Sequence, residues 1–210
     1  MLYKDATAPL DDRVKDLLGR MSIEEKFAQL RCVSTNDVAP HGVLDTQAAQ
    51  EQLAAGVGHL ARGVYDDLPP EQIAESSNDL QRFLIEHTRL GIPALIYERD
   101  LVDTCSSHHL VMPAAIGLAA SFSPALAREL AVLQRAQARS IGSHMVIGPD
   151  LDLAHAQGGT AFLTGYGDNA YLVSRMGVST VRGLQGELLR DGVAACACLL
   201  YTSPSPRDRG

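Results

Sequence analysis

The chain has 210 residues, of which 46% are hydrophobic and 20% are charged, and its formal net charge is −7. This composition is typical of one globular domain with a sizeable core. The acidic balance, together with the lack of any lysine or arginine run, argues against nucleic acid as a partner. No apolar run is long enough to cross a bilayer, so we expect no membrane partner either.

The N-terminal residues 1–13 lack the apolar core of a signal peptide, which predicts a cytoplasmic location for the chain as written. A segment encoded upstream would reverse this prediction, so a secreted or periplasmic protein stays open. No Cys-x-x-Cys pair occurs, and we expect no metal and no cofactor. The four cysteines are interpreted as buried or incidental thiols of a reducing compartment: Cys32, Cys105, Cys196 and Cys198.

Helical and extended patterns alternate along the chain. Residues 9–30 have helical apolar spacing, with a second start at Ser22, where Glu25 completes a capping box. Residues 31–45 and 101–121 look irregular, and 156–169 form a glycine-rich loop. The other helices are expected over 46–55, 69–90, 124–141 and 170–189, and the strands over 57–60, 92–97, 145–147 and 193–197.

Strands that alternate with helices favour a parallel sheet with right-handed crossovers, so the predicted fold class is α/β. About four strand–helix units can be counted, which is half of a (β/α)8 barrel of the TIM type. An open doubly wound sheet is the alternative. The lack of a G-x-G-x-x-G pattern after the first strand argues against its dinucleotide-binding form.

Acidic residues follow the short apolar run 145–147. Gly148 and Pro149 end this run, which predicts a strand that is buried on both faces. Asp150 and Asp152 come next, spaced for one face of an extended segment. Because α/β folds bind ligands at the carboxyl ends of parallel strands, the two aspartates are candidate ligand contacts. The alternative is that one caps a turn and the other is solvated.

A second acidic group, Glu98 and Asp100, closes the expected strand 92–97. The same argument makes this pair a candidate for ligand contact at the mouth of a barrel. The alternative interpretation is an ion pair at the surface with Arg99 or Arg89.

Six segments, in this order, resemble the N-terminal domain of glycoside hydrolase family 3. They are DDRVKDLLGRMSIEEKFAQL, TRLGIPALIYE, MPAAIGLAASFSPAL, GPDLDLAH, GYGDNAYLVSRMGVSTVRGLQG and DGVAACA. The resemblance covers nearly all of residues 3–197. It implies a (β/α)8 barrel and a retaining, exo-acting β-glycosidase of the β-glucosidase or β-xylosidase type, with an oligosaccharide or glycoside as substrate. In such enzymes one carboxylate attacks the anomeric carbon and another protonates the leaving oxygen.

The resemblance also implies which parts of the site this chain holds. The family's nucleophilic Asp lies beyond residue 197 and its acid/base usually later still, so we expect no catalytic residue here and an inactive isolated chain. Asp152 matches a family Asp, which either orients the loop backbone or contacts sugar. His155 stands where the family has an Arg. The implied substrate-binding residues are Glu98, Asp100, Asp152 and His155.

Two departures from the family pattern bear on function. The family's Arg-Asp-Pro-Arg-Trp-Gly-Arg is replaced by residues 155–161, so the sugar-clamping Arg is absent, and the family's acidic residue after the second strand falls at Arg99. A catalytically inactive sugar-binding or structural barrel is therefore the alternative function. A third hypothesis is a hydrolase of altered specificity, in which His155 and Gln157 replace the clamp.

The expected domain boundary lies near the C-terminus. Residues 1–197 are expected to form the N-terminal part of the barrel domain. Residues 198–210 resemble translated adapter read-through, and we interpret them as a non-native tail, with a native disordered tail as the alternative.

Overall fold

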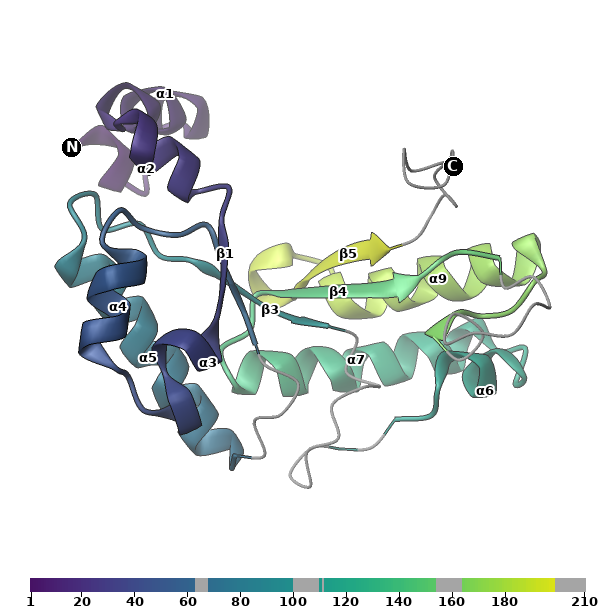
Figure 1. Ribbon diagram of the computed structural model, residues 1–210. Coiled ribbons are helices and arrows are strands. Elements are labelled where there is room, and N and C mark those ends of the chain that lie inside the picture. Colours follow the sequence, from purple (N-terminus) through teal and green to yellow (C-terminus); the bar gives the residue numbers. More distant parts are fainter. Residues whose placement is uncertain (63–67, 100–109, 111, 154–163, 199–210) are drawn as a thin grey trace, which may run out of the picture.

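The computed structural model describes residues 1–62, 68–99, 110, 112–153 and 164–198 (Figure 1). Their five strands form one parallel sheet in the order β1-β2-β3-β4-β5. The strands are β1 (Cys32–Ser34), β2 (His59–Ala61), β3 (Leu95–Arg99), β4 (Met145–Asp150) and β5 (Ala194–Cys198). Sequential parallel strands joined by helices are the arrangement of a β/α barrel, so the predicted partial barrel is confirmed, with five strands where about four were expected.

The longer helices start where local chemistry favours a start. Before α7 (Pro124–Ser140), the Ser123 side chain accepts a hydrogen bond from the Leu126 amide. Before α9 (Ala170–Gln185), Asn169 does the same for the Leu172 amide. A proline opens α5 (Pro70–His87). These are standard N-terminal helix signals, and the corresponding predictions are confirmed.

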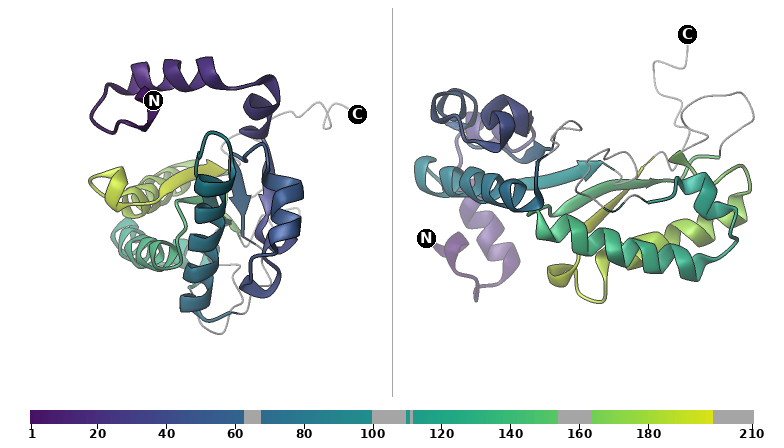
Figure 2. Two further views of the ribbon diagram at one scale, coloured as in Figure 1. Left: turned by 90° about the vertical axis from the view of Figure 1, so that its left-hand side faces the viewer. Right: turned by 90° about the horizontal axis from the view of Figure 1, so that it is seen from below.

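In the described part of the chain, the helices that contribute to the core pack on one face of the sheet. Val33, Leu60 and Ile96 stand opposite one another in the register of the first three strands, and all three are buried. They share a core cluster with Leu53 of α4 (Thr46–Leu53) and Leu84 of α5. A separate cluster joins Val146 of β4 to α7 and α9. Figure 2 shows these helices around the sheet from two further directions.

The opposite face of the sheet, called here the open face, carries the alternate residues of each strand. Leu95 on this face is 47% exposed, and Cys32 and Cys196 are exposed as well. Their exposure differs from the expectation of buried thiols. In a closed barrel the face away from the helices forms the interior, so the open face is the side on which ligands of a barrel approach at the carboxyl ends.

The N-terminal segment lies to one side of the sheet in Figure 1. It contains the 3-10 turn Leu2–Lys4, α1 (Leu10–Arg20) and α2 (Ile23–Ala28), and the predicted Ser22–Glu25 capping box is present. Arg89 binds it by donating from Nε to Glu25 Oε1 at 2.8 Å. The Tyr3 hydroxyl donates to the Leu90 carbonyl at 2.7 Å. Two long-range contacts therefore connect this segment to the end of α5.

Predictions of local structure were wrong in two expected loops and at β4. Residues 31–45 contain β1, α3 (Thr35–Val38) and the 3-10 turn Pro40–Gly42, and the predicted loop 101–121 contains α6 (Ala115–Ala119). A 3-10 turn, Leu189–Asp191, precedes β5. Gly148 and Pro149 do not end β4, which continues to Asp150. Burial alternates over its first three residues: Val146 is buried while Met145 and Ile147 are half-buried. One side of β4 packs on helices and the other belongs to the open face.

Within the described ranges, no helix is long and apolar enough to cross a membrane.

Candidate functional site

The candidate site lies at the carboxyl end of β4, on the open face. Ile147 stands opposite Cys196, and Asp150 stands opposite Cys198, so three residues of β4 match two of β5. An extra residue in one strand is a β-bulge, and it moves the following side chains to the other face. Counting two residues at a time from buried Val146 would put Asp150 among the helices. The bulge puts it in the same row as Ile147 and Cys196, on the open face.

The four residues Asp150 to Leu153 alternate between the two sides. Leu151 and Leu153 pack against a buried cluster that contains Val173 and Met176 of α9. The Leu151 amide donates to the Cys198 carbonyl at 2.8 Å, which keeps this stretch extended beside β5. Successive side chains of an extended segment point to opposite sides, so Asp150 and Asp152 lie on the side away from α9. The predicted shared face of the two aspartates follows from this geometry.

In the part of the chain that the structure describes, Asp152 has an unpartnered carboxylate oxygen and a raised pKa. Its Oδ1 is buried without a hydrogen-bond partner among the described residues. Burial, and then the charge of Asp150, raise the pKa of the Asp152 carboxyl above its ordinary value. An acidic oxygen that lacks a partner and is held beside a second carboxylate favours a donor from outside, such as a hydroxyl group.

Glu98 lies on the other side of the sheet. Its register partner is Val146, so it points toward the helices, and it is 2% exposed. Arg62 Nε donates to Glu98 Oε1 at 2.5 Å, and the Ser143 hydroxyl donates to the same oxygen. The surface ion pair suggested as an alternative was wrong in both place and partner, because the pair is buried and its cation is Arg62. Arg89 pairs with Glu25 instead.

The Arg62 guanidinium connects Glu98 to the helix layer. It donates to the Ser77 hydroxyl of α5 at 2.9 Å and to the Ile141 carbonyl at 3.0 Å. Every bond in this network joins parts of the chain that are far apart in sequence. Ligand contact by Glu98 stays a prediction, and its burial beneath the sheet argues for a structural role instead.

The other two predicted substrate-binding residues, Asp100 and His155, lie outside the described residues, as do all of the altered positions 155–161. Of the four predicted residues, the structure therefore places Asp152 at the open face and Glu98 under the sheet. It places Asp150, the other aspartate predicted as a ligand contact after this strand, on the same side as Asp152.

Two residues of the open face were missed as site candidates. Tyr97 and Arg99 occupy the alternate positions of β3, and Arg99 is exposed at its carboxyl end, level with Ile147. The Tyr97 hydroxyl lies 3.4 Å from the Cys32 thiol, and burial together with that thiol raises the pKa of Tyr97 to about 12. Side chains alternate along a strand, so Tyr97 and Arg99 point away from the side of buried Ile96. This alternation would have assigned both residues to the open face.

The described part of the chain contains no group of three or more His, Cys, Asp or Glu residues that could hold a metal ion. An apolar groove of about 500 Å³ runs between Leu151, Leu153 and α9, and neither aspartate lines it.

The open face offers three kinds of polar group to a polyhydroxylated ligand: the carboxylates of Asp150 and Asp152, the guanidinium of Arg99 and the neutral phenol of Tyr97. These are groups that bind hydroxyls through charge-assisted hydrogen bonds.

The model of the glycosyl hydrolase family 3 N-terminal domain matches residues 22–198. β-Glucosidase C of Emericella nidulans is 29% identical over 89% of this chain and 31% of its own length. A periplasmic β-glucosidase/β-xylosidase of Dickeya chrysanthemi is 29% identical over 87% of this chain and 30% of its own.

Among solved structures, a β-glucosidase of Erythrobacter marinus superposes with a TM-score of 0.80 at 24% identity, over 92% of this chain and 26% of that one. The likeness in fold supports the partial barrel. The chain spans less than a third of the length of each of these three proteins. The chain belongs to glycosyl hydrolase family 3, as part of its N-terminal domain.

Proposed function

We propose that the whole protein containing this chain is a retaining, exo-acting β-glycosidase of the β-glucosidase or β-xylosidase type. It hydrolyses terminal O-glycosidic bonds of short oligosaccharides or glycosides. The observation that carries the proposal is the pair Asp150 and Asp152, held on the open face at a strand's carboxyl end, in a family whose named relatives are β-glucosidases and β-xylosidases.

In this proposal the chain supplies sugar binding, and the two reacting carboxylates come from outside it. The half-buried Asp152 carboxylate accepts a hydrogen bond from a sugar hydroxyl, and Asp150 and Arg99 border the same face. Asp100 and His155 are proposed as further contacts from the segments that follow β3 and β4. One external carboxylate attacks the anomeric carbon and the other protonates the leaving oxygen. No metal or cofactor has a part in this chemistry.

The alternative is a barrel of the same family that binds sugar or has a purely structural role, without catalysis. The replacement of the clamp sequence at residues 155–161, including His155 in place of an Arg, favours this alternative. A hydrolase of altered specificity, with His155 and Gln157 in the clamp position, is tested by the same assay if amino-sugar glycosides are included.

The test is turnover of nitrophenyl β-glycosides by the whole protein, with Asp152→Ala as the variant. Losing a hydrogen bond to a charged group costs about 1.5–3 kcal/mol, so kcat/KM should fall about tenfold or more. Asp191→Ala is the matched control, because its carboxylate is 71% exposed in a turn and should leave kcat/KM unchanged. An unchanged kcat/KM in Asp152→Ala would contradict the proposed contact between Asp152 and the sugar. No turnover of any glycoside, with binding retained, would favour the inactive barrel.

Location and domain limits belong to the same proposal. The relative from Dickeya chrysanthemi is named periplasmic, whereas the chain as written predicts the cytoplasm. Fractionation of cells that produce the whole protein distinguishes these locations. We also propose that the native barrel sequence is interrupted after residue 197, and resequencing of the coding region across residues 198–210 tests this.

A further inference from the structure

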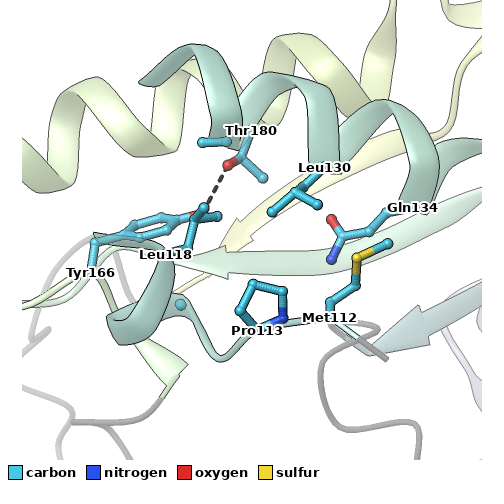
Figure 3. A pocket seen from close by; sticks show the side chains of 9 residues that line it. Met112, Pro113, Leu118, Leu130, Gln134, Tyr166 and Thr180 are labelled. Carbon is cyan, nitrogen blue, oxygen red and sulfur yellow. Dashed lines mark hydrogen bonds between the residues drawn. The ribbon is translucent and has the colours of Figure 1, made fainter. Parts of the chain in front are cut away.

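The chain rejoins the helix layer at a small buried junction after leaving the carboxyl ends of β3 and β4. Met112 and Tyr166 lie on either side of a cavity of about 20 Å³, with Gln134 of α7 and Thr180 of α9 in its wall (Figure 3). A cavity of this size is about as large as one water molecule. Met112, which follows β3 in the chain, and Tyr166, which follows β4, are therefore both packed against α7 and α9 at this junction.

Tyr166 forms the polar anchor of this junction. Its side chain is 3% exposed, and its hydroxyl lies 2.8 Å from the Thr180 hydroxyl, toward which it points in Figure 3. Thr180 is on the buried side of α9. A buried hydrogen bond between two hydroxyls fixes the direction of the tyrosine ring, because breaking it costs free energy in a site that water does not reach.

The anchor lies one residue away from the candidate site. Gly165 forms a parallel bridge with Asp150, the last residue of β4. Tyr166 also belongs to the buried cluster against which Leu151 and Leu153 pack, and these leucines flank Asp152. Tyr166 is therefore linked to the two aspartates in two ways: through the backbone bridge of Gly165 with Asp150, and through the buried cluster that it shares with Leu151 and Leu153.

We propose that Tyr166 is a positioning residue for the open-face site: through its bond to Thr180 it holds Gly165, and thereby the Asp150–Leu153 stretch, in place. Tyr166 itself does not contact the ligand. The effect on sugar binding rests on the proposed function, whereas the effect on the Asp150–Leu153 stretch does not and is measured separately.

The first readout is hydrogen exchange of the Leu151 amide in the whole protein, followed by mass spectrometry. Tyr166→Phe keeps the ring and removes the hydroxyl, and exchange should become about five- to tenfold faster as the local bond is lost. Thr180→Val should do the same, and Thr180→Ser, which keeps a hydroxyl, should restore slow exchange. Tyr3→Phe is the matched control, because it removes a buried tyrosine hydroxyl that bonds the Leu90 carbonyl far from the site.

The second readout is the split between KM and kcat on a nitrophenyl β-glycoside. Misplacing groups that bind sugar without reacting should raise KM about fivefold and change kcat less. Faster Leu151 exchange with no turnover even in the unmodified protein would support the positioning role and reject the proposed function. Unchanged Leu151 exchange and KM in Tyr166→Phe would overturn the proposal. Exchange that rises equally throughout the chain, as for a general loss of stability, would overturn it too.

Discussion

Replacing Glu98 by alanine should strongly lower the free energy of unfolding of the chain. The Arg62 and Glu98 side chains are 7% and 3% exposed, so the substitution leaves a guanidinium buried without a carboxylate. Its remaining acceptors are neutral and cannot balance the charge: the Ser77 and Ser143 hydroxyls and the Ile141 carbonyl. Removing one partner of a buried ion pair costs about 3–5 kcal/mol, and we expect the free energy of unfolding to fall by that amount.

The assay is urea unfolding of the 210-residue chain, followed by far-ultraviolet circular dichroism because the chain has no tryptophan. Glu98→Gln keeps an acceptor for Ser143 and should lose less stability than Glu98→Ala. Asp79→Ala is the control: Asp79 pairs with Arg82 at 2.8 Å, but both side chains are well exposed. An exposed pair contributes about 0–1 kcal/mol, so this control should barely change the free energy of unfolding.

A loss for Glu98→Ala as small as that of the control would refute the buried pair. The more informative failure would be a stable Glu98→Ala chain whose parent protein binds sugar more weakly. That combination would place Glu98 at the barrel mouth, as its position at the end of a strand first suggested.

Three further substitutions test the packing and the titrating groups. Gly183→Ala should destabilise the chain in urea despite the better helix propensity of alanine, because its Cβ would come within 2.5 Å of Ala131 Cβ on α7. Burial, helped by two nearby arginines, lowers the pKa of His144, whose Nδ1 accepts the Ile96 amide at 3.2 Å. The unfolded chain therefore binds this proton more readily, and the melting temperature should fall as pH drops below about 6.5, less so in His144→Gln. Asp152→Asn should raise the melting temperature at neutral pH, since the raised pKa means that folding disfavours the charged carboxylate, and the gain should vanish near pH 3.8 and below.

The elements that could be predicted from sequence are those whose signals are local. Helices α5, α7 and α9 combine a start signal with apolar residues at helical spacing, and both features act within one or two turns. The strand β1 was missed because Cys32–Ser34 is too short for an alternating pattern. Helix α6 was missed because its five residues include a glycine and no polar cap, and it is held by packing against α9.

The site was harder to predict than the fold because it depends on which face of the sheet each residue occupies. Glu98 and Asp150 both close an apolar strand, and position along the chain treats them alike. Buried Ile96 fixes the face of Glu98 by simple alternation, and that face is the helix layer, where Arg62 neutralises it. This assignment was available from the sequence once Ile96 was recognised as buried.

The face of Asp150 could not be found in the same way. It depends on one extra residue between Ile147 and Asp150, and a bulge becomes visible only when the neighbouring strand β5 supplies the register. Without that bulge, Leu151 and Leu153 would point to the open face, and both aspartates would point toward the apolar cluster that contains Val173 and Met176 of α9. Placing two carboxylates against an apolar cluster costs free energy, so the pattern Asp-Leu-Asp-Leu after Gly-Pro favours the change of face. The sequence pattern therefore favours an open-face position for both aspartates, but only the register with β5 shows how the backbone achieves it.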